Sequence, residues 1–308
     1  MTDEQKTRCQ WRRCYKMVSL LHTNRTMDFF FFVALKVLPG NAHESPVLYE
    51  QVKQFVATVG KGVMKRLIVD RGFLDGTSIS TCKKDYDIDV LIPVRRNMDI
   101  YKDAIALFQL PEVTWVCLEE PVAETKASPR PRPEAIVNRE KKRQETLEQL
   151  KEQKPSLPSE EIIVKREAAT IGEFRSWSAC TVPLSVVATR ETYADGHEKV
   201  WLLIDTKEVE DPTEASEQYH LRTTIEERHR QLKCFIDLTK FTSRAFSMVI
   251  NQVVFIMLSY NLLQLYLLRQ GHKELNNETL PHIRQQLLPS VNHIIVYFEN
   301  YYSLFAPL

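Results

Sequence analysis

The segment from Tyr219 to Lys233 (YHLRTTIEERHRQLK) carries one aromatic hydroxyl, two cations and one carboxylate, on Tyr219, Arg222, Lys233 and Glu226. At about 3.6 residues per turn, Arg222, Glu226 and Lys233 fall at about 300°, 340° and 320° from Tyr219 on a helix. The four side chains would then share an arc of about 60°. Such an arc could hold the four side chains together for chemistry. It could also be a solvated helix face, which is what most charge runs are.

The same segment carries a second, apolar arc. Its members are centred near about 220° on the same helical projection. They are Leu221, Ile225, Leu232, Phe235 and Ile236. We therefore expect a helix that packs on a core along one side and presents the polar residues along the neighbouring side.

The composition is that of a globular protein. The chain has 308 residues, of which 44% are hydrophobic and 26% charged, and a net charge of +1. This length fits two domains, or one large domain with an insertion. The near-neutral charge means that nucleic-acid binding would depend on local patches.

Cellular location can be inferred from the cysteines and from the apolar segments. The six cysteines include no C-x-x-C pair and no metal-ligand spacing with histidine, which favours reduced thiols in the cytoplasm. The N-terminal residues 1–10 contain no apolar run typical of a signal peptide. The apolar stretch from Met248 to Leu268 contains polar residues such as Asn261 and Gln264, so we predict a buried helix there and no membrane span.

The first third of the chain predicts a mixed sheet with helices. Residues 14–22 and 29–38 are apolar, β-favouring runs joined by a polar turn, which predicts a hairpin. Residues 67–69 are a continuous apolar run, typical of an interior strand buried on both faces, and Asp70 stands where this strand ends. Helices are expected at 45–59 and 75–84, and a further buried strand at 87–95.

The remainder of the chain changes character twice. Residues 121–170 are proline-flanked and dense in charge, which predicts an exposed helix or a mobile inserted segment. Residues 176–207 alternate and contain the turn signal Ala194-Asp195-Gly196, which predicts a β-hairpin. After Asp211-Pro212 the pattern is helical, with helices expected at 243–270 and 281–303.

These residues resemble a known family. A buried strand that ends in Asp-Arg-Gly-Phe (70–73), followed far downstream by Tyr-x2-Arg-x3-Glu-x6-Lys (219–233) and a long apolar helix, resembles bacterial insertion-sequence transposases of the DDE type. Within that family, the chain is similar to the group defined by the Tyr-Arg-Glu-Lys signature. The resemblance covers roughly residues 11–268, and the segments YKMVSLLH, HES, VDRGF, TIEERHRQLK and SYNLLQ follow the order of that family.

The resemblance implies an α/β fold: a ribonuclease-H-like mixed sheet flanked by helices, with an inserted helical and β segment and a helical C-terminal region. On this basis we divide the chain into three parts. Residues 11–120 are the N-terminal part of the catalytic core, 121–210 the insertion, and 211–308 the C-terminal helical part that carries the catalytic glutamate.

The resemblance also implies a site. Asp70 would be the second and Glu226 the third of three carboxylates that hold two Mg²⁺ ions for DNA cleavage and strand transfer. Tyr219, Arg222 and Lys233 would contact DNA phosphates near the transposon end. The partners implied are transposon-end and target DNA, with a homodimer allowed and no membrane.

Several other residues have ordinary interpretations. Arg71, Asp75, Asp87 and Asp89 are expected to be surface or turn charges, and His229 a surface histidine. Trp177 and Trp201 lie in the insertion, where an aromatic residue of this family can receive a flipped base. Packing within the insertion is the expected role of both tryptophans.

The first carboxylate of the family has no match in this sequence. It should stand on a strand ahead of the hairpin, but residues 1–13 contain no apolar strand, and neither Asp3 nor Asp28 fits. We interpret the chain as the C-terminal portion of a transposase, a truncated copy with an incomplete site that leaves activity open. The alternative is a non-catalytic remnant that binds DNA or a full-length partner.

Overall fold

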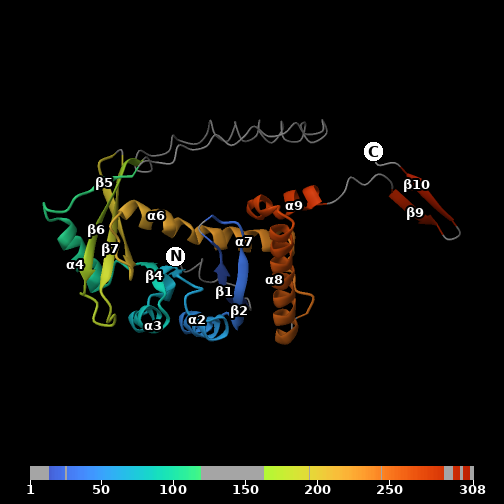
Figure 1. Cartoon of the computed structure of the whole chain (residues 1–308), viewed down its shortest axis with the longest axis horizontal. Coiled ribbons are helices and arrows are strands. Elements are labelled where there is room, and N and C mark those ends of the chain that lie inside the picture. Colours follow the sequence, from blue (N-terminus) through green and yellow to red (C-terminus); the bar gives the residue numbers. More distant parts are fainter. Residues whose placement is uncertain are drawn as a thin grey trace, which may run out of the picture. The chain divides into compact units, whose positions relative to one another are not determined.

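The computed structural model describes residues 14–24, 26–118, 163–193, 195–243, 245–287, 294–298 and 301–305, and Figure 1 draws its helices and strands, with labels where there is room. The chain divides into two compact units. The hairpin unit is Met1–Val63 with Leu221–Leu308, and the sheet unit is Met64–His220. Each unit is described separately below.

The hairpin unit is built on two antiparallel strands and the helices around them. Its N-terminal elements are β1 (Tyr15–His22), β2 (Phe31–Pro39) and α2 (Ser45–Val59). Its C-terminal elements are α7 (Arg222–Phe235), α8 (Phe246–Arg269), the 3-10 helix η3 (Lys273–Asn277), α9 (Leu280–Leu287), β9 (Ile294–Phe298) and β10 (Tyr301–Phe305). The predicted hairpin and the predicted helix at 45–59 are therefore confirmed.

The β1–β2 hairpin packs on both of its faces. Met17 and Leu21 of β1 lie against a core that includes Leu232 of α7 and Met257 of α8. Val18 and Leu20 alternate with them and are also buried, and α2 contacts both strands. The hairpin is thus enclosed between α2 and the helices α7 and α8.

Polar side chains of α8 bind the backbone of β2 and of Phe30, the residue just before it. Asn261 accepts a hydrogen bond from Phe32 N at 2.9 Å and donates one to Phe32 O at 2.9 Å. Gln264, which is fully buried, accepts from Phe30 N at 3.2 Å. These amides supply the pairing that a neighbouring strand would otherwise give to a strand edge.

Helix α8 is buried along one side only. Val253, Met257 and Tyr260 are buried in the core, whereas Phe255 and Leu262 are more than half exposed. Within the described residues, this 24-residue helix is the one segment long and apolar enough to cross a membrane. The prediction of a buried helix is therefore confirmed for the side that binds the hairpin, and the opposite side is exposed.

The predicted helix at 281–303 is wrong for the described residues 294–298 and 301–303. The chain instead forms the antiparallel strands β9 and β10, with Tyr301 opposite Phe298. Ile294-Ile-Val-Tyr-Phe298 is an unbroken run of β-branched and aromatic residues, which favour extended backbone over helix.

The sheet unit is built on a six-stranded sheet. Its strands are β3 (Arg66–Ile68), β4 (Asp89–Pro93), β5 (Val116–Cys117), β6 (Ile163–Phe174), β7 (Leu184–Tyr193) and β8 (Glu198–Asp205). Its helices are η1 (Arg71–Phe73), α3 (Gly76–Tyr86), α4 (Asp99–Phe108) and α6 (Pro212–His220). The strand order is β3-β4-β8-β7-β6-β5, in which β3 and β4 are parallel and the other neighbours antiparallel.

Strand β3 lies at the edge of this sheet, so the prediction of an interior strand at 67–69 is wrong. Within the described residues, β3 pairs with β4 alone. Leu67 and Val69 are nevertheless buried, which explains the apolar run. An apolar run in the sequence indicates that the side chains are buried, but it does not indicate whether the strand pairs with one neighbouring strand or with two.

Helix α6 covers one face of the sheet. Its Ala215 packs with Leu91 of β4, Val187 of β7 and Leu203 of β8, in a cluster that also includes Tyr219. Neighbouring residues of β4, such as Ile92, point to the opposite face and are also fully buried.

The predicted fold class, a mixed α/β sheet flanked by helices, is confirmed. The hairpin expected within 176–207 forms β7 and β8, and the sheet continues into β4 and β3. Residues 163–170 were expected in an exposed helix or mobile segment, and this is wrong, because they belong to β6, pair with β7 and bury Ala168 and Ala169 in the sheet. Gly196 has a φ of 87° in the turn between β7 and β8, as the turn signal predicts. The charged helix expected within 121–170 falls mainly on residues 119–162, outside the described residues.

Candidate active site

Asp70 follows the end of β3, as predicted. Its backbone is extended, and its side chain is exposed. Its Oδ1 accepts a hydrogen bond from Arg71 N at 2.7 Å, so the carboxylate caps the short helix η1. Capping is compatible with metal binding, because a carboxylate has two oxygens and several lone pairs.

The turn after Asp70 is bound by an arginine that follows strand β4. Arg95, just beyond β4, donates from Nε and Nη2 to the carbonyl oxygen of Arg71, at 3.1 and 3.0 Å. Because β3 and β4 are parallel, their carboxyl ends meet at one edge of the sheet. Asp70 therefore stands beside two arginine residues at that edge.

The other acidic residues near β3 behave largely as expected. Asp75 accepts a hydrogen bond from Ser78 near the start of α3, and Asp87 adopts the left-handed conformation that ends this helix. Asp89 forms an ion pair with Lys83, in which Oδ1 and Nζ are 2.6 Å apart. These three residues have structural partners or turn roles within the sheet unit.

The signature segment is divided between two helices, which corrects the single helix predicted from Tyr219 to Lys233. Helix α6 ends at His220 and α7 begins at Arg222, with Leu221 between them. The boundary between the two units falls at the same place. Two β-branched threonines, Thr223 and Thr224, follow in the first turn of α7, and such residues favour helix less than most.

Three of the four signature residues lie on α7. Arg222 Nη1 donates to Glu226 Oε1 at 2.6 Å. The Glu226 side chain remains 59% exposed in this ion pair, and Lys233 is also exposed. The predicted grouping of Arg222, Glu226 and Lys233 along one side of a helix is therefore found in the hairpin unit.

His229 lies within this group, and its predicted place at the surface is wrong. Its Nε2 is 3.1 Å from Ser19 Oγ of β1, and its ring stacks on Phe32 of β2 with centroids 5.6 Å apart. Burial lowers the pKa of His229 to about 4; Lys233 lowers it further and Glu226 opposes the shift. The imidazole of His229 is therefore neutral at pH 7, near an anionic and a cationic member of the group.

Tyr219 belongs to the sheet unit. It packs against the cluster under α6, and its ring lies 6.2 Å from that of Trp201 on β8. Trp201 is partly buried there, which agrees with the packing role expected for it. Trp177 is also partly buried, in the loop between β6 and β7.

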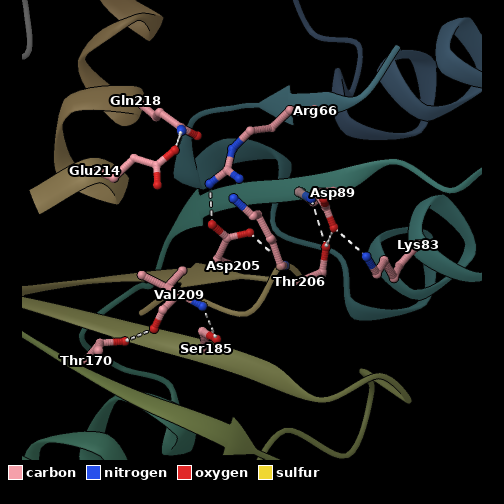
Figure 2. Close-up of polar contacts among 12 residues, drawn as sticks. Arg66, Lys83, Asp89, Thr170, Ser185, Asp205, Thr206, Val209, Glu214 and Gln218 are labelled. Atoms are coloured by element: carbon pink, nitrogen blue, oxygen red, sulfur yellow. Dashed lines mark hydrogen bonds and ion pairs between the residues drawn. The ribbon is translucent and has the colours of Figure 1, made fainter. Parts of the chain in front are cut away.

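A buried ion pair in the sheet unit was not predicted from the sequence. The Asp205 side chain at the end of β8 is fully buried and accepts a bond from Arg66 Nη2 of β3 (Figure 2). Its other oxygen accepts from Lys207 N at 2.8 Å. Burial raises the pKa of Asp205, and the guanidinium of Arg66 opposes that shift.

The carboxylates suit a hard divalent cation. Asp70 and Glu226 offer exposed oxygen ligands, which Mg²⁺ prefers, and each has one oxygen in a hydrogen bond that orients it. Within the part of the chain that the structure describes, no group of three or more His, Cys, Asp or Glu residues could hold a metal ion. Asp70 belongs to the sheet unit and Glu226 to the hairpin unit.

Comparison with known proteins gives the family. The model of the transposase DDE domain matches residues 2–262 of the chain, which includes the Asp-Arg-Gly-Phe segment and the complete Tyr-Arg-Glu-Lys signature. No curated protein matches the sequence. This family generally depends on divalent metal ions and acts on DNA in transposition. The chain belongs to the family of transposase DDE domains.

Proposed function

We propose that this chain acts in the cleavage and joining of DNA at insertion-sequence ends, as a transposase of the Tyr-Arg-Glu-Lys group. In this proposal Asp70 and Glu226 are ligands of Mg²⁺. Tyr219, Arg222 and Lys233 contact DNA phosphates. The observation that carries the proposal is the group on α7, in which the mostly exposed Glu226 is ion-paired with Arg222, whose side chain is largely covered.

An ion pair of this kind contributes little to folding. Exposed pairs one helical turn apart typically stabilise a protein by about 0.3–0.5 kcal/mol. The Arg222–Glu226 pair can therefore be exchanged at low cost for contacts to a phosphate and a metal ion. The arginine supplies a bidentate phosphate donor, and the glutamate supplies hard oxygen ligands.

The chemistry needs both carboxylates. When bound, divalent ions would stabilise the charge that develops on the attacking and leaving oxygens of a phosphodiester. Asp70 and Glu226 would hold these ions, while Arg222 and Lys233 would contact DNA phosphates near the transposon end. Neutral His229 beside Glu226 adds no charge that would compete for the phosphates or the cations.

The test is a nicking assay on DNA that carries transposon ends, in Mg²⁺ and in Mn²⁺. We expect weak cleavage at most, because two carboxylates neutralise a metal pair incompletely. Any cleavage should be abolished in Asp70→Ala and in Glu226→Ala and retained in Asp75→Ala. Efficient cleavage that depends on Asp70 would reveal a further carboxylate ligand. Cleavage that survives both catalytic substitutions would contradict the proposed site.

The second candidate function is DNA binding without catalysis. It is favoured because the described residues contain no group of three ligands. It predicts specific, salt-dependent DNA binding with no nicking under any metal. A chain that neither nicks nor binds DNA would contradict both candidates.

Two further expectations remain predictions. A homodimer is tested by light scattering with and without DNA. A cytoplasmic location is tested by fractionation of cells that express the full chain.

A further inference from the structure

We propose that Arg66 and Asp205 form a clamp that positions Asp70. The clamp is a buried ion pair across the sheet that fixes the direction of β3, the strand whose end carries Asp70. Asp205 and Arg66 would thus be positioning residues for the metal ligand. The inference rests on the proposed function of Asp70.

Strand β3 needs such support. It contains three residues, and within the described residues β4 is the one strand that pairs with it. A backbone hydrogen bond from Val69 N to Leu91 O at 3.2 Å extends the pairing by one residue. Short edge strands with few hydrogen bonds open readily, and an opening here would move Asp70.

The clamp reaches across two strands. Register places Ile68 of β3 beside Leu91 of β4, and Leu91 beside Asp205 of β8. Arg66 lies two residues before Ile68, so its side chain points to the same face and crosses β4 to reach Asp205 (Figure 2). The ion pair therefore ties the edge strand to a central strand.

Side chains alternate between the two faces along an extended strand, and this relates the direction of Arg66 to that of Asp70. Arg66, Ile68 and Asp70 are two residues apart along the chain, and the backbone at Asp70 is still extended. Their side chains therefore point to one face. A rotation of β3 about its axis would turn Arg66 and Asp70 together, so a fixed Arg66 restrains the direction of Asp70.

The carboxylate of Asp205 is itself held rigidly. It is fully buried, and its two oxygens accept from Arg66 and from Lys207 N. Beside it, Asp89 of β4 is bound by Lys83 of α3 at 2.6 Å. A buried ion pair is weak evidence for stability, because burial of the charges offsets much of their attraction. The proposed clamp depends instead on the fixed geometry of the Arg66–Asp205 ion pair, which restrains the position of β3.

Two measurements on the full chain test the clamp. The first is hydrogen exchange at the amides of residues 67–73, which reports opening of β3 directly. Asp205→Asn should speed exchange there by at least about tenfold. The matched control is Glu167→Gln, which removes another buried carboxylate of the same sheet, paired with Arg190 at 2.9 Å. Equal exchange in wild type and Asp205→Asn would overturn the clamp.

The second measurement is Mn²⁺ affinity of the folded protein, which a purely structural role would leave unchanged. Asp205→Asn should weaken Mn²⁺ binding several-fold, and Glu167→Gln should not. Asp70→Ala should weaken binding more, and adding Asp205→Asn to it should have no further effect, because both act on one ligand. Wild-type affinity in Asp205→Asn would overturn the positioning role.

Failure of the proposed function has a different outcome. If wild type and Asp70→Ala bind Mn²⁺ equally, Asp70 is not a ligand, and the exchange measurement alone decides whether the clamp holds β3.

If Asp205→Asn does not fold, variants of Arg66 test the clamp instead. Arg66→Lys keeps the charge and should preserve slow exchange at 67–73, whereas Arg66→Gln should not. Equal exchange in these two variants would overturn the clamp.

Discussion

Arg222 and Glu226 are joined on α7 by a 2.6 Å hydrogen bond between their charged groups, one helical turn apart. The arginine side chain is largely covered, and the glutamate is mostly exposed. The pair thus holds an anion-binding group and a cation-binding group in contact with each other. Binding of DNA or of a metal ion would release one partner from the other.

Removal of Glu226 should strengthen DNA binding in the absence of divalent ions. Glu226→Gln frees Arg222 and removes repulsion from phosphates, which should raise affinity by roughly two- to fivefold, the size of an exposed ion pair. The control is Glu227→Gln, since Glu227 is paired with Arg230 on the same helix. Fluorescence anisotropy with transposon-end DNA measures both variants. An equal gain in the two would indicate a general charge effect.

The cations of α7 should determine the salt dependence of DNA binding. Arg222→Ala with Lys233→Ala removes up to two phosphate contacts, which should flatten the slope of log affinity against log salt by roughly 1 to 2. The control double variant is Lys53→Ala with Lys61→Ala, which removes the same charge from exposed positions of the hairpin unit. Equal changes in the two double variants would show that Arg222 and Lys233 are ordinary surface charges and make no specific contact with DNA.

Protonation of His229 should destabilise the hairpin unit in acid. Its pKa is about 4 in the folded chain, against an ordinary value of 6.5. The unfolded chain therefore takes up this proton first as the pH falls. The stability that depends on a neutral imidazole is present above pH 6.5 and is lost as the pH falls toward 4, by on the order of 2–3 kcal/mol.

Urea denaturation at pH 7, 5.5 and 4.5 measures this loss. His229→Gln cannot take up a proton at these pH values, so its stability should fall less than that of wild type over the same range. Parallel pH dependence in the two proteins would show that His229 is not the residue responsible.

Asn261 should stabilise the hairpin unit through its amide. Asn261→Leu leaves the backbone N–H and carbonyl of Phe32 without partners in a buried strand, which should cost about 2–4 kcal/mol. Asn251→Leu makes the same change at an exposed position of α8 and should cost little. Chemical denaturation compares the two variants, and a similar cost for both would contradict the role of the amide in closing the strand edge.

Local signals predicted local structure well. Helix α2 spans the predicted residues because Pro46 stands in its first turn and Gly60, with a φ of 93°, follows its last. Asp70 was placed correctly because an apolar run ends directly before it. These features depend on neighbours within a few residues.

Nonlocal contacts explain what was missed. The burial of His229 depends on Ser19 and Phe32, which are about 200 residues away in the sequence. The partner of Arg66 is Asp205, and no spacing rule connects them. The break at Leu221 was missed because an arc computed on a helical wheel assumes that the helix is continuous.

That break gives the signature an unusual position. Tyr219 is the next-to-last residue of the sheet unit, which ends at His220, and Arg222 follows Leu221, where the C-terminal segment of the hairpin unit begins. A DNA strand that contacts both residues would be a bridge between two bodies that each have their own core. The substrate would then act as a structural component of the complex, because a single DNA strand would be held by residues of both units.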